Sequence, residues 1–262
     1  MYMASISSSS PRSLVETVLR EKFEGNPPFR GDKRFAVVKS DDDRPRALVN
    51  DALLDGRAVA YEVAVTCDEL KEPDRFVYQY SHELAHFWFT PIEHPFLEVC
   101  AVAISLSVLS LCAEEWKQTG SSHVQKRYSQ GFENYRRRVE QGAAEQFRGL
   151  GVEEYMSRGS AAALSSTVRD EHIAAGAALA KQVLDKQSSW LPLISLHSFV
   201  CQDDTGLELL DFDLWEQSLD PTCESHRVFA NDVIRLFSST FGVMKQVRPS
   251  FLEKLCCRCL KA

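Results

Sequence analysis

The chain has 262 residues, of which 44% are hydrophobic and 26% are charged, a composition typical of globular proteins rather than of disordered or fibrous ones. Its formal net charge of -7 and pI near 5.6 argue against a broad nucleic-acid-binding surface, because such a surface needs clustered Lys and Arg. We therefore expect no nucleic-acid partner. The length allows one large domain, or a small domain with a helical extension.

Residues 1–12 contain a serine run and lack the apolar core of a secretory signal, so we expect a flexible tail there. The longest apolar stretch, Val99–Ala113, is shorter than the roughly 20 residues that span a bilayer, which predicts a buried core helix and no transmembrane segment. Cys100 and Cys112 lie in this stretch, where thiols pack as small hydrophobic groups. A reducing, cytoplasmic location is the expectation.

The first third of the chain carries the predicted β-structure. Ser13–Leu19 begins a short helix that the turn residues Gly25–Pro28 end. Phe35–Val38 is a strand candidate, and Ala58–Val65 alternates in the period of two that marks a half-buried strand. Phe76–Tyr80 fits either another strand or the entry to the following helix.

Helical patterns dominate from Ser81 onward, and a break at Thr119–Ser122 marks a candidate subdomain edge. The helices that we predict from apolar periodicity and end signals cover residues 81–89, 95–117, 123–148, 167–187, 206–219 and 225–241.

The first of these helices contains the sequence His-Glu-Leu-Ala-His. His82 and His86 are four residues apart, so on a helix both imidazoles lie on one face and can bind the same metal ion. Glu83 lies beside them, and a carboxylate next to a metal can take a proton from water and return it to a leaving amine. This division of roles is typical of zinc peptidases.

A catalytic zinc site needs a third protein ligand, and Glu93, His94 and Glu98 are the candidates that follow. Pro91 should end the first helix and Pro95 should begin the next, which places Glu98 about one turn inside it. A ligand on a helix is held rigidly, and a carboxylate entering an apolar helix needs a partner. These arguments favour Glu98, and His94 and Glu93 remain alternatives.

His82–Phe89, read with the downstream segment Leu97–Ala101, resembles the gluzincin metallopeptidases over about twenty residues. The local likeness is greatest to enzymes of the aminopeptidase N type, in which Trp-Phe also follows the second His. The spacer between His86 and Glu98 is shorter than in those enzymes, and their Gly-x-Met-Glu-Asn segment is missing, so exopeptidase activity is not supported. The compact layout resembles instead metallopeptidases of the ImmA/IrrE type.

The gluzincin resemblance implies that Zn²⁺ is held by His82, His86 and Glu98, that Glu83 is the general base, and that Val59–Val65 is a strand aligning a peptide substrate. The early strands and the later helical patterns together predict an α+β, mostly helical fold, in which a small N-terminal β-sheet packs on a zincin-like active-site helix and a helical C-terminal half follows. With the break near residue 120 as the boundary, we expect a minimal metal-binding domain at 13–120 and a helical region at 121–262 packed on it, which could belong to the same domain.

Many gluzincins use a downstream Tyr or His to stabilise the oxyanion of the reaction, and spacing does not choose among the candidates here. These candidates are Tyr128, Tyr135, Tyr155, His123 and His172.

Two other groups of residues have structural interpretations. Arg136–Arg138 lies on a helix rich in Glu, which favours a solvated face whose charges pair with one another. Cys256, Cys257 and Cys259 offer a second metal site with Cys223 or His226, an exposed redox site or a lipid attachment site. They match no complete spacing for any of these, which favours solvent-exposed thiols.

The sequence thus predicts a zinc-dependent hydrolase, specifically an endopeptidase or narrow-specificity metallopeptidase, with a peptide or polypeptide as substrate. The alternative is a regulatory or protein-interaction protein that keeps a zincin-like metal site without catalysis. The oligomeric state does not follow from the sequence.

Overall fold

The structure is a computed structural model that describes residues 10–25, 35–41, 44–49, 61–89, 95–120, 122–146, 166–202 and 208–241. Within these ranges the fold is α+β and mostly helical, as the sequence predicts. The α-helices are α1 (Pro11–Lys22), α2 (Pro73–Phe89), α3 (Pro95–Thr119), α4 (His123–Gln146), α7 (Ser166–Gln182), α8 (Pro192–Leu196), α9 (Phe212–Ser218) and α10 (Glu224–Phe241). The strands are β1 (Phe35–Lys39), β2 (Arg46–Val49), β3 (Tyr61–Val65), β4 (Val200–Gln202) and β5 (Glu208–Leu210), and the 3₁₀ helices are η3 (Leu184–Lys186) and η4 (His197–Phe199).

β3 is the central strand of a three-stranded sheet. It pairs in parallel with β1 and antiparallel with β2, so both of its edges are occupied. The expectation that this strand aligns a peptide substrate is therefore wrong, because a substrate strand needs an unpaired edge. Tyr61 of β3 packs edge-on against Phe87 of α2, with ring centroids 5.2 Å apart, and this contact holds the sheet against the helix.

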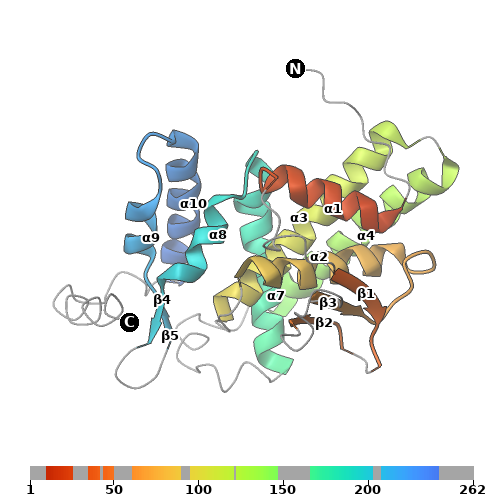
Figure 1. Cartoon of the computed structure of the whole chain (residues 1–262), viewed down its shortest axis with the longest axis horizontal. Coiled ribbons are helices and arrows are strands. Elements are labelled where there is room, and N and C mark those ends of the chain that lie inside the picture. The colour runs from red at the N-terminus through yellow and green to blue at the C-terminus, as the bar shows by residue number, and fades with distance from the viewer. Residues whose placement is uncertain are drawn as a thin grey trace.

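α3 forms the centre of the fold and packs against α2, α4 and α7 (Figure 1). From Phe96 to Leu109 every side chain except Glu98 is buried, as expected for a helix that is apolar on all sides. Among the described residues, Phe96–Thr119 alone is long and apolar enough to cross a membrane, and 83% of its apolar window is buried inside the protein. Contact with the neighbouring helices is sufficient to explain its composition.

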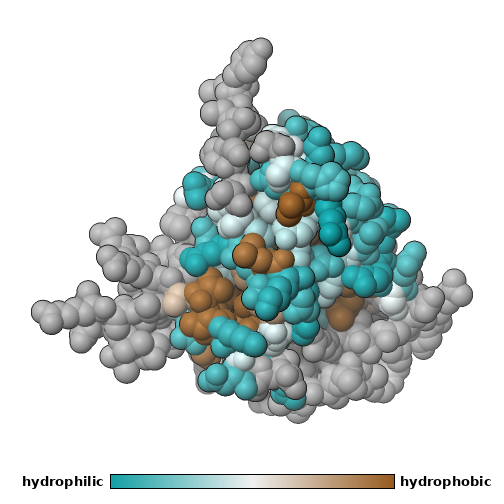
Figure 2. All heavy atoms as spheres, turned by 90° about the vertical axis from the view of Figure 1, so that its right-hand side faces the viewer, coloured by the Kyte–Doolittle hydropathy of each residue, from teal (hydrophilic) through white to brown (hydrophobic). Residues whose placement is uncertain are grey.

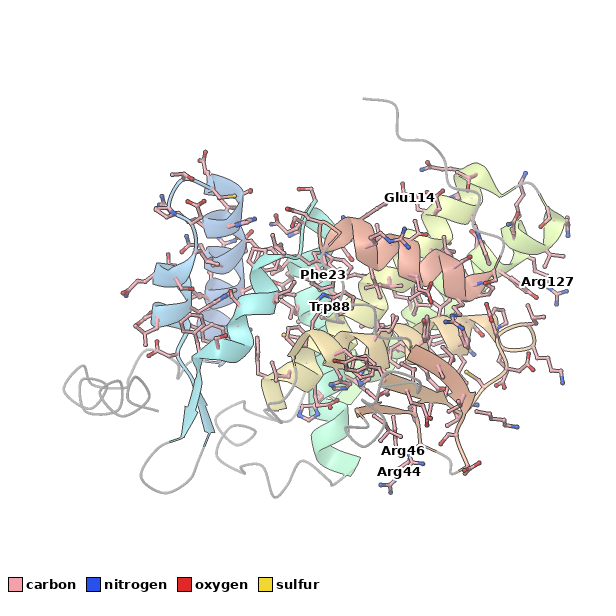
Figure 3. All side chains as sticks on the ribbon, viewed as in Figure 1. Phe23, Arg44, Arg46, Trp88, Glu114 and Arg127 are labelled. Carbon is pink, nitrogen blue, oxygen red and sulfur yellow. The ribbon has the colours of Figure 1, made fainter. Side chains whose placement is uncertain are left out.

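The segment 184–190 ties α1 to the core. The Trp190 indole is fully buried, its ring meets Phe23 edge-on at 5.8 Å, and its Nε1–H donates to the Leu184 carbonyl at 3.1 Å. Phe23 in turn stacks on Trp88 of α2, with ring centroids 4.3 Å apart. Figure 3 labels both residues where α1 meets α2. The Trp190 backbone N–H also donates to the carbonyl of Lys22 at 2.7 Å, so the end of α1 is fixed from two sides.

Several predicted boundaries need correction. Pro11 and Arg12 belong to α1 rather than to the tail, because Ser10 and Ser13 form a capping box that starts the helix there. The stretch Phe76–Tyr80 is helical, and α2 begins at Pro73, two turns before the predicted start at residue 81. Apolar residues at 76, 77, 80 and 84 give this extension the buried face of a helix.

The β-structure is not confined to the first third of the chain. β4 and β5 pair antiparallel between residues 200 and 210, so the helix predicted at 206–219 is wrong in its first part and survives only as α9. Asp211 caps α9 by accepting a hydrogen bond from the Leu214 backbone N–H, which sets the helix start after the strand. α9 and α10 lie at the opposite end of the molecule from the three-stranded sheet (Figure 1).

The interpretation of Arg136–Arg138 as a solvated face holds only in part. Arg136 is 8% exposed, and its guanidinium donates to both carboxylate oxygens of Asp185, at 3.1 and 2.5 Å, as well as to Glu140 and Ser110. A buried guanidinium needs such partners because burial without them is costly. Arg137 and Arg138 remain exposed.

The face at the right of Figure 1 is mostly hydrophilic and carries a few separate hydrophobic areas (Figure 2). Large exposed hydrophobic residues are scattered over different elements, with Leu48 on β2, Leu70 before α2 and Val124 on α4. Isolated residues of this kind are normal on protein surfaces. Arg44 and Arg46 project from the β2 edge of the sheet (Figure 3), and charged side chains on an edge strand disfavour aggregation.

Trp190→Ala should lower the free energy of unfolding by about 3–5 kcal/mol, because it removes a fully buried ring and its hydrogen bond to Leu184. Urea denaturation followed by circular dichroism measures this change. Ser188→Ala, an exposed position two residues away, is the control and should change it by less than about 0.5 kcal/mol. A loss below about 1 kcal/mol for Trp190→Ala would contradict the structural role given to this side chain.

Candidate metal centre

Three side chains from α2 and α3 converge at one point. His82 Nε2 lies 3.3 Å from one carboxylate oxygen of Glu98, and His86 Nε2 lies 3.3 Å from the other. One donor atom from each residue lies within 4.8 Å of those of the other two. Two imidazole nitrogens and a carboxylate oxygen at such separations form a group that could hold a metal ion.

The local sequence produces this arrangement by simple helix geometry. His82 and His86 are successive residues on one face of α2, and their rings meet edge-on with centroids 4.9 Å apart. α2 ends at Phe89 and α3 begins at Pro95, so Glu98 lies in the first turn of α3, where the sequence predicts it. The alternative ligands Glu93 and His94 lie outside the described residues.

The site is partly open to solvent. The side chains of His82, His86 and Glu98 are 16%, 24% and 44% exposed, in contrast to the fully buried residues that surround them on α3. A catalytic metal site needs this access because its last coordination position must admit water and substrate.

The protonation states suit metal binding at neutral pH. Burial is the main cause that lowers the pKa of His86 to about 4, and the neighbouring His82 lowers it further. Burial acts to raise the pKa of Glu98, but the hydrogen bond from His82 and the charges of His82, His86 and His172 outweigh it and lower that pKa to about 2. His86 is therefore neutral and Glu98 is ionised at pH 7, which are the forms that bind metals.

His172 of α7 is a further titratable group at the site. It is 5% exposed and interacts electrostatically with both Glu98 and His82. Burial, the largest cause, lowers its pKa to about 4, with Glu98 acting in the opposite direction. Of the four downstream candidates that the structure describes, His172 is the one that the fold brings to the carboxylate. Chain spacing alone could not choose it, because α7 lies about 70 residues after Glu98 in the sequence.

Tyr135 reaches the site only through another aromatic ring. It packs on Tyr78 at a centroid distance of 5.5 Å, and Tyr78 stacks on His82 at 6.2 Å. Tyr78 of α2 therefore separates Tyr135 of α4 from His82.

The other oxyanion candidates do not reach the site. Tyr128 packs on Trp116 and donates to the Leu70 carbonyl, about 27 Å along α3 from Glu98 at 1.5 Å per residue. His123 is exposed at the start of α4, beside the same far end of α3. Tyr155 lies outside the described residues.

Glu83 is on α2 between the two histidines and is 5% exposed. It follows His82 directly and precedes His86 by three residues, so it lies on the adjacent surface of the same helical turn.

The remaining cysteine predictions concern other parts of the chain. Cys256, Cys257 and Cys259 lie outside the described residues. Cys67, Cys100 and Cys112 are buried free thiols, and burial raises the pKa of Cys67 to about 11. Such thiols are protonated at neutral pH and unreactive.

Comparison of the chain with protein-family models, with curated proteins and with solved structures gives no match. The geometry of the metal centre is therefore the basis for assigning its chemistry.

Glu98→Ala should abolish stoichiometric metal binding, because two imidazoles without the carboxylate leave too few ligands. We expect the metal affinity to fall by more than the roughly 100-fold typical for the loss of an outer-shell group. Elemental analysis after dialysis against metal-free buffer measures this. Glu114→Ala is the matched control, since Glu114 is exposed near the other end of the same helix (Figure 3). Equal metal content in the two variants would contradict the assignment of Glu98 as a ligand.

Proposed function

We propose that this protein is a zinc-dependent hydrolase, specifically a metallopeptidase that cleaves internal or narrowly selected amide bonds of a polypeptide. The observation that carries the proposal is the convergence of His82 Nε2 and His86 Nε2 on the two oxygens of Glu98, each at 3.3 Å. The buried Glu83 beside them supplies the acid–base group that hydrolysis needs.

The donor set favours zinc among the common metal ions. Calcium and magnesium prefer all-oxygen sites, whereas two imidazoles and one carboxylate are typical of catalytic Zn²⁺. Ligands about 2.0–2.1 Å from a tetrahedral ion lie about 3.3–3.4 Å from one another. Each histidine nitrogen lies 3.3 Å from a different oxygen of Glu98, and one donor atom from each of the three residues lies within 4.8 Å of the others. This spacing supports zinc if the side chains adjust slightly toward a shared ion.

Each residue then has a separate part in the reaction. Bound zinc would supply a Lewis acid that lowers the pKa of water and polarises the substrate carbonyl. His82, His86 and Glu98 would hold the ion, and the negative charge of the Glu98 carboxylate would reduce the net positive charge of the site. Glu83 takes the proton from the attacking water and delivers it to the leaving nitrogen of the amide. Glu83 is not one of the three converging residues, so in this proposal it acts on the proton and not as a ligand.

The sheet offers a place for an extended substrate. β3 is enclosed by its neighbours, but β2 is an edge strand of the described sheet and packs against α2, the helix that carries both histidines. A peptide added antiparallel or parallel to such an edge gains backbone hydrogen bonds without requiring a particular sequence. For this reason we propose that the substrate backbone pairs with β2. The rings of Tyr78 and Tyr135, which pack on each other, would then contact the substrate side chains and select among them.

Glu83→Gln should leave metal binding intact and lower kcat by about 10²–10⁴-fold, because the amide cannot accept a proton. Fluorescently labelled, unfolded casein and a mixture of quenched peptides serve as substrates, with metal content measured on the same sample. Glu72→Gln is the control, since Glu72 lies just before α2 and pairs with Arg75 at the surface.

Cleavage by Glu83→Gln at the wild-type rate would reject the general-base role. A wild-type protein that binds one zinc yet cleaves none of these substrates, and that loses no binding property in Glu83→Gln, would favour the non-catalytic regulatory alternative.

A further inference from the structure

α7 approaches α3 unusually closely at Gly176. A Cβ atom placed on Gly176 would lie 2.5 Å from Cγ1 and 2.6 Å from Cβ of Val102, and 3.0 Å from the Val99 carbonyl oxygen. Contacts this short are essentially never seen for real side chains, so only glycine allows the two helices to meet at this distance. The contact fixes both the separation and the register of α7 on α3.

The register places His172 opposite Glu98. Gly176 contacts Val102, and Asp185 of η3, just after the end of α7, accepts a hydrogen bond at 2.8 Å from Ser107, which lies further along α3. The chain therefore follows α3 in the same direction through α7 and into η3. His172 is four residues before Gly176 and Glu98 is four residues before Val102, so each lies one turn back on the same face of its helix. His172 therefore reaches the same level of the molecule as Glu98, one turn beyond the contact that sets the helix spacing.

His172 has the chemistry to hold a carboxylate. Its imidazole is buried and interacts electrostatically with Glu98. A neutral imidazole carries one N–H donor, and an ionised carboxylate offers about four lone-pair positions, of which His82 and His86 face one on each oxygen. A donor on α7 can use another of these positions without competing with the two histidines of α2.

We propose that His172 is a positioning residue that holds the Glu98 carboxylate in its metal-binding orientation, with the Gly176 contact setting the distance between them. The inference rests on the metal site of the proposed function but not on peptide hydrolysis. It extends the metal centre from α2 and α3 to α7 and makes a residue of the helical second half a part of it. Carboxylate ligands supported in this way bind metals more tightly, because their orientation is fixed before the ion arrives.

His172→Phe tests the proposal by keeping the ring and removing its N–H. Competition with a chromophoric chelator gives the affinity for Zn²⁺, and the visible spectrum of the Co²⁺ form reports on the geometry of the ligands. We expect a 10- to 100-fold weaker affinity and a shifted Co²⁺ spectrum, the range typical for loss of an outer-shell partner. His123→Phe, which removes an exposed histidine, should change neither.

Rescue separates a positioning role from simple packing. Asn at position 172 places an amide N–H near the Nδ1 position of the imidazole, and Gln places one near Nε2. Among the residues that it describes, the structure gives Nε2 of His172 no hydrogen bond, which leaves Nδ1 as the nitrogen that donates, so His172→Asn should recover more of the affinity lost in His172→Phe than His172→Gln does. If both remain as weak as His172→Phe while the metal-free proteins are folded by circular dichroism, the proposal is overturned.

Gly176→Ala tests the same inference without altering a polar group, and it remains informative if His172→Phe does not fold. The added methyl group must push α7 from α3, so the metal affinity should fall in the same direction. Gly142→Ala on α4 is the matched control, because a Cβ there meets nothing within 4 Å. Equal affinity in these two glycine variants would overturn the distance-setting role.

The outcomes also separate this proposal from the proposed function. If the zinc affinity depends on His172 but the wild-type protein cleaves no peptide, the positioning role stands and the hydrolase proposal fails. If the protein cleaves peptides and His172→Phe binds zinc as tightly as the wild type, the hydrolase proposal stands and the positioning role is overturned. An unchanged affinity with a lowered kcat in His172→Phe would also overturn it, since this places His172 against the substrate instead.

Discussion

The burial of α3 is the constraint on which the candidate metal centre depends. A helix that is apolar on all sides gains stability only when neighbours cover its whole circumference, and α2, α4 and α7 provide that cover. Two of these neighbours also bring side chains to the Glu98 end of α3. α2 contributes His82 and His86, and α7 contributes His172, whereas Tyr135 of α4 contacts His82 only through Tyr78. The hydrophobic effect thus assembles residues that are far apart in the sequence, although it has no preference for any of them.

Glu98 is the charged residue by which the otherwise buried first part of α3 takes part in the candidate metal site. It is the one side chain between Phe96 and Leu109 that is not buried, and it lies in the first turn of α3, where the unpaired backbone N–H groups and the helix dipole favour a negative charge. Desolvation opposes ionisation of this carboxyl, and the surrounding imidazoles reverse the balance. The ionised form therefore depends on the helix packing that brings the imidazoles close.

The parts of the site that the sequence predicts are those set by local geometry. The spacing of His82 and His86 fixes one helix face, and Pro95 fixes the start of α3 and so the place of Glu98. His172 could not be singled out, because its place is set by the contact of Gly176 with Val102, which is a matter of tertiary packing. The same limit explains β2 and the β4–β5 pair, whose short strands have few alternating residues and gain their stability from partners elsewhere. The fold class was predictable because it depends on long helical patterns that outweigh such errors.

The contacts of Glu98 also bear on how a metal ion would enter. A ring nitrogen that donates a proton to the carboxylate cannot at the same time offer its lone pair to a metal, so binding must exchange at least one of the two histidine contacts for coordination and move the imidazole proton to Nδ1. During that exchange the carboxylate loses the partners that hold it from α2. A donor on a different helix is unaffected by the exchange, and this is the physical advantage of the role that we propose for His172. A support on α7 keeps Glu98 in place whichever of the two states the histidines occupy, so the ligand set does not have to reorganise as a whole when the ion binds.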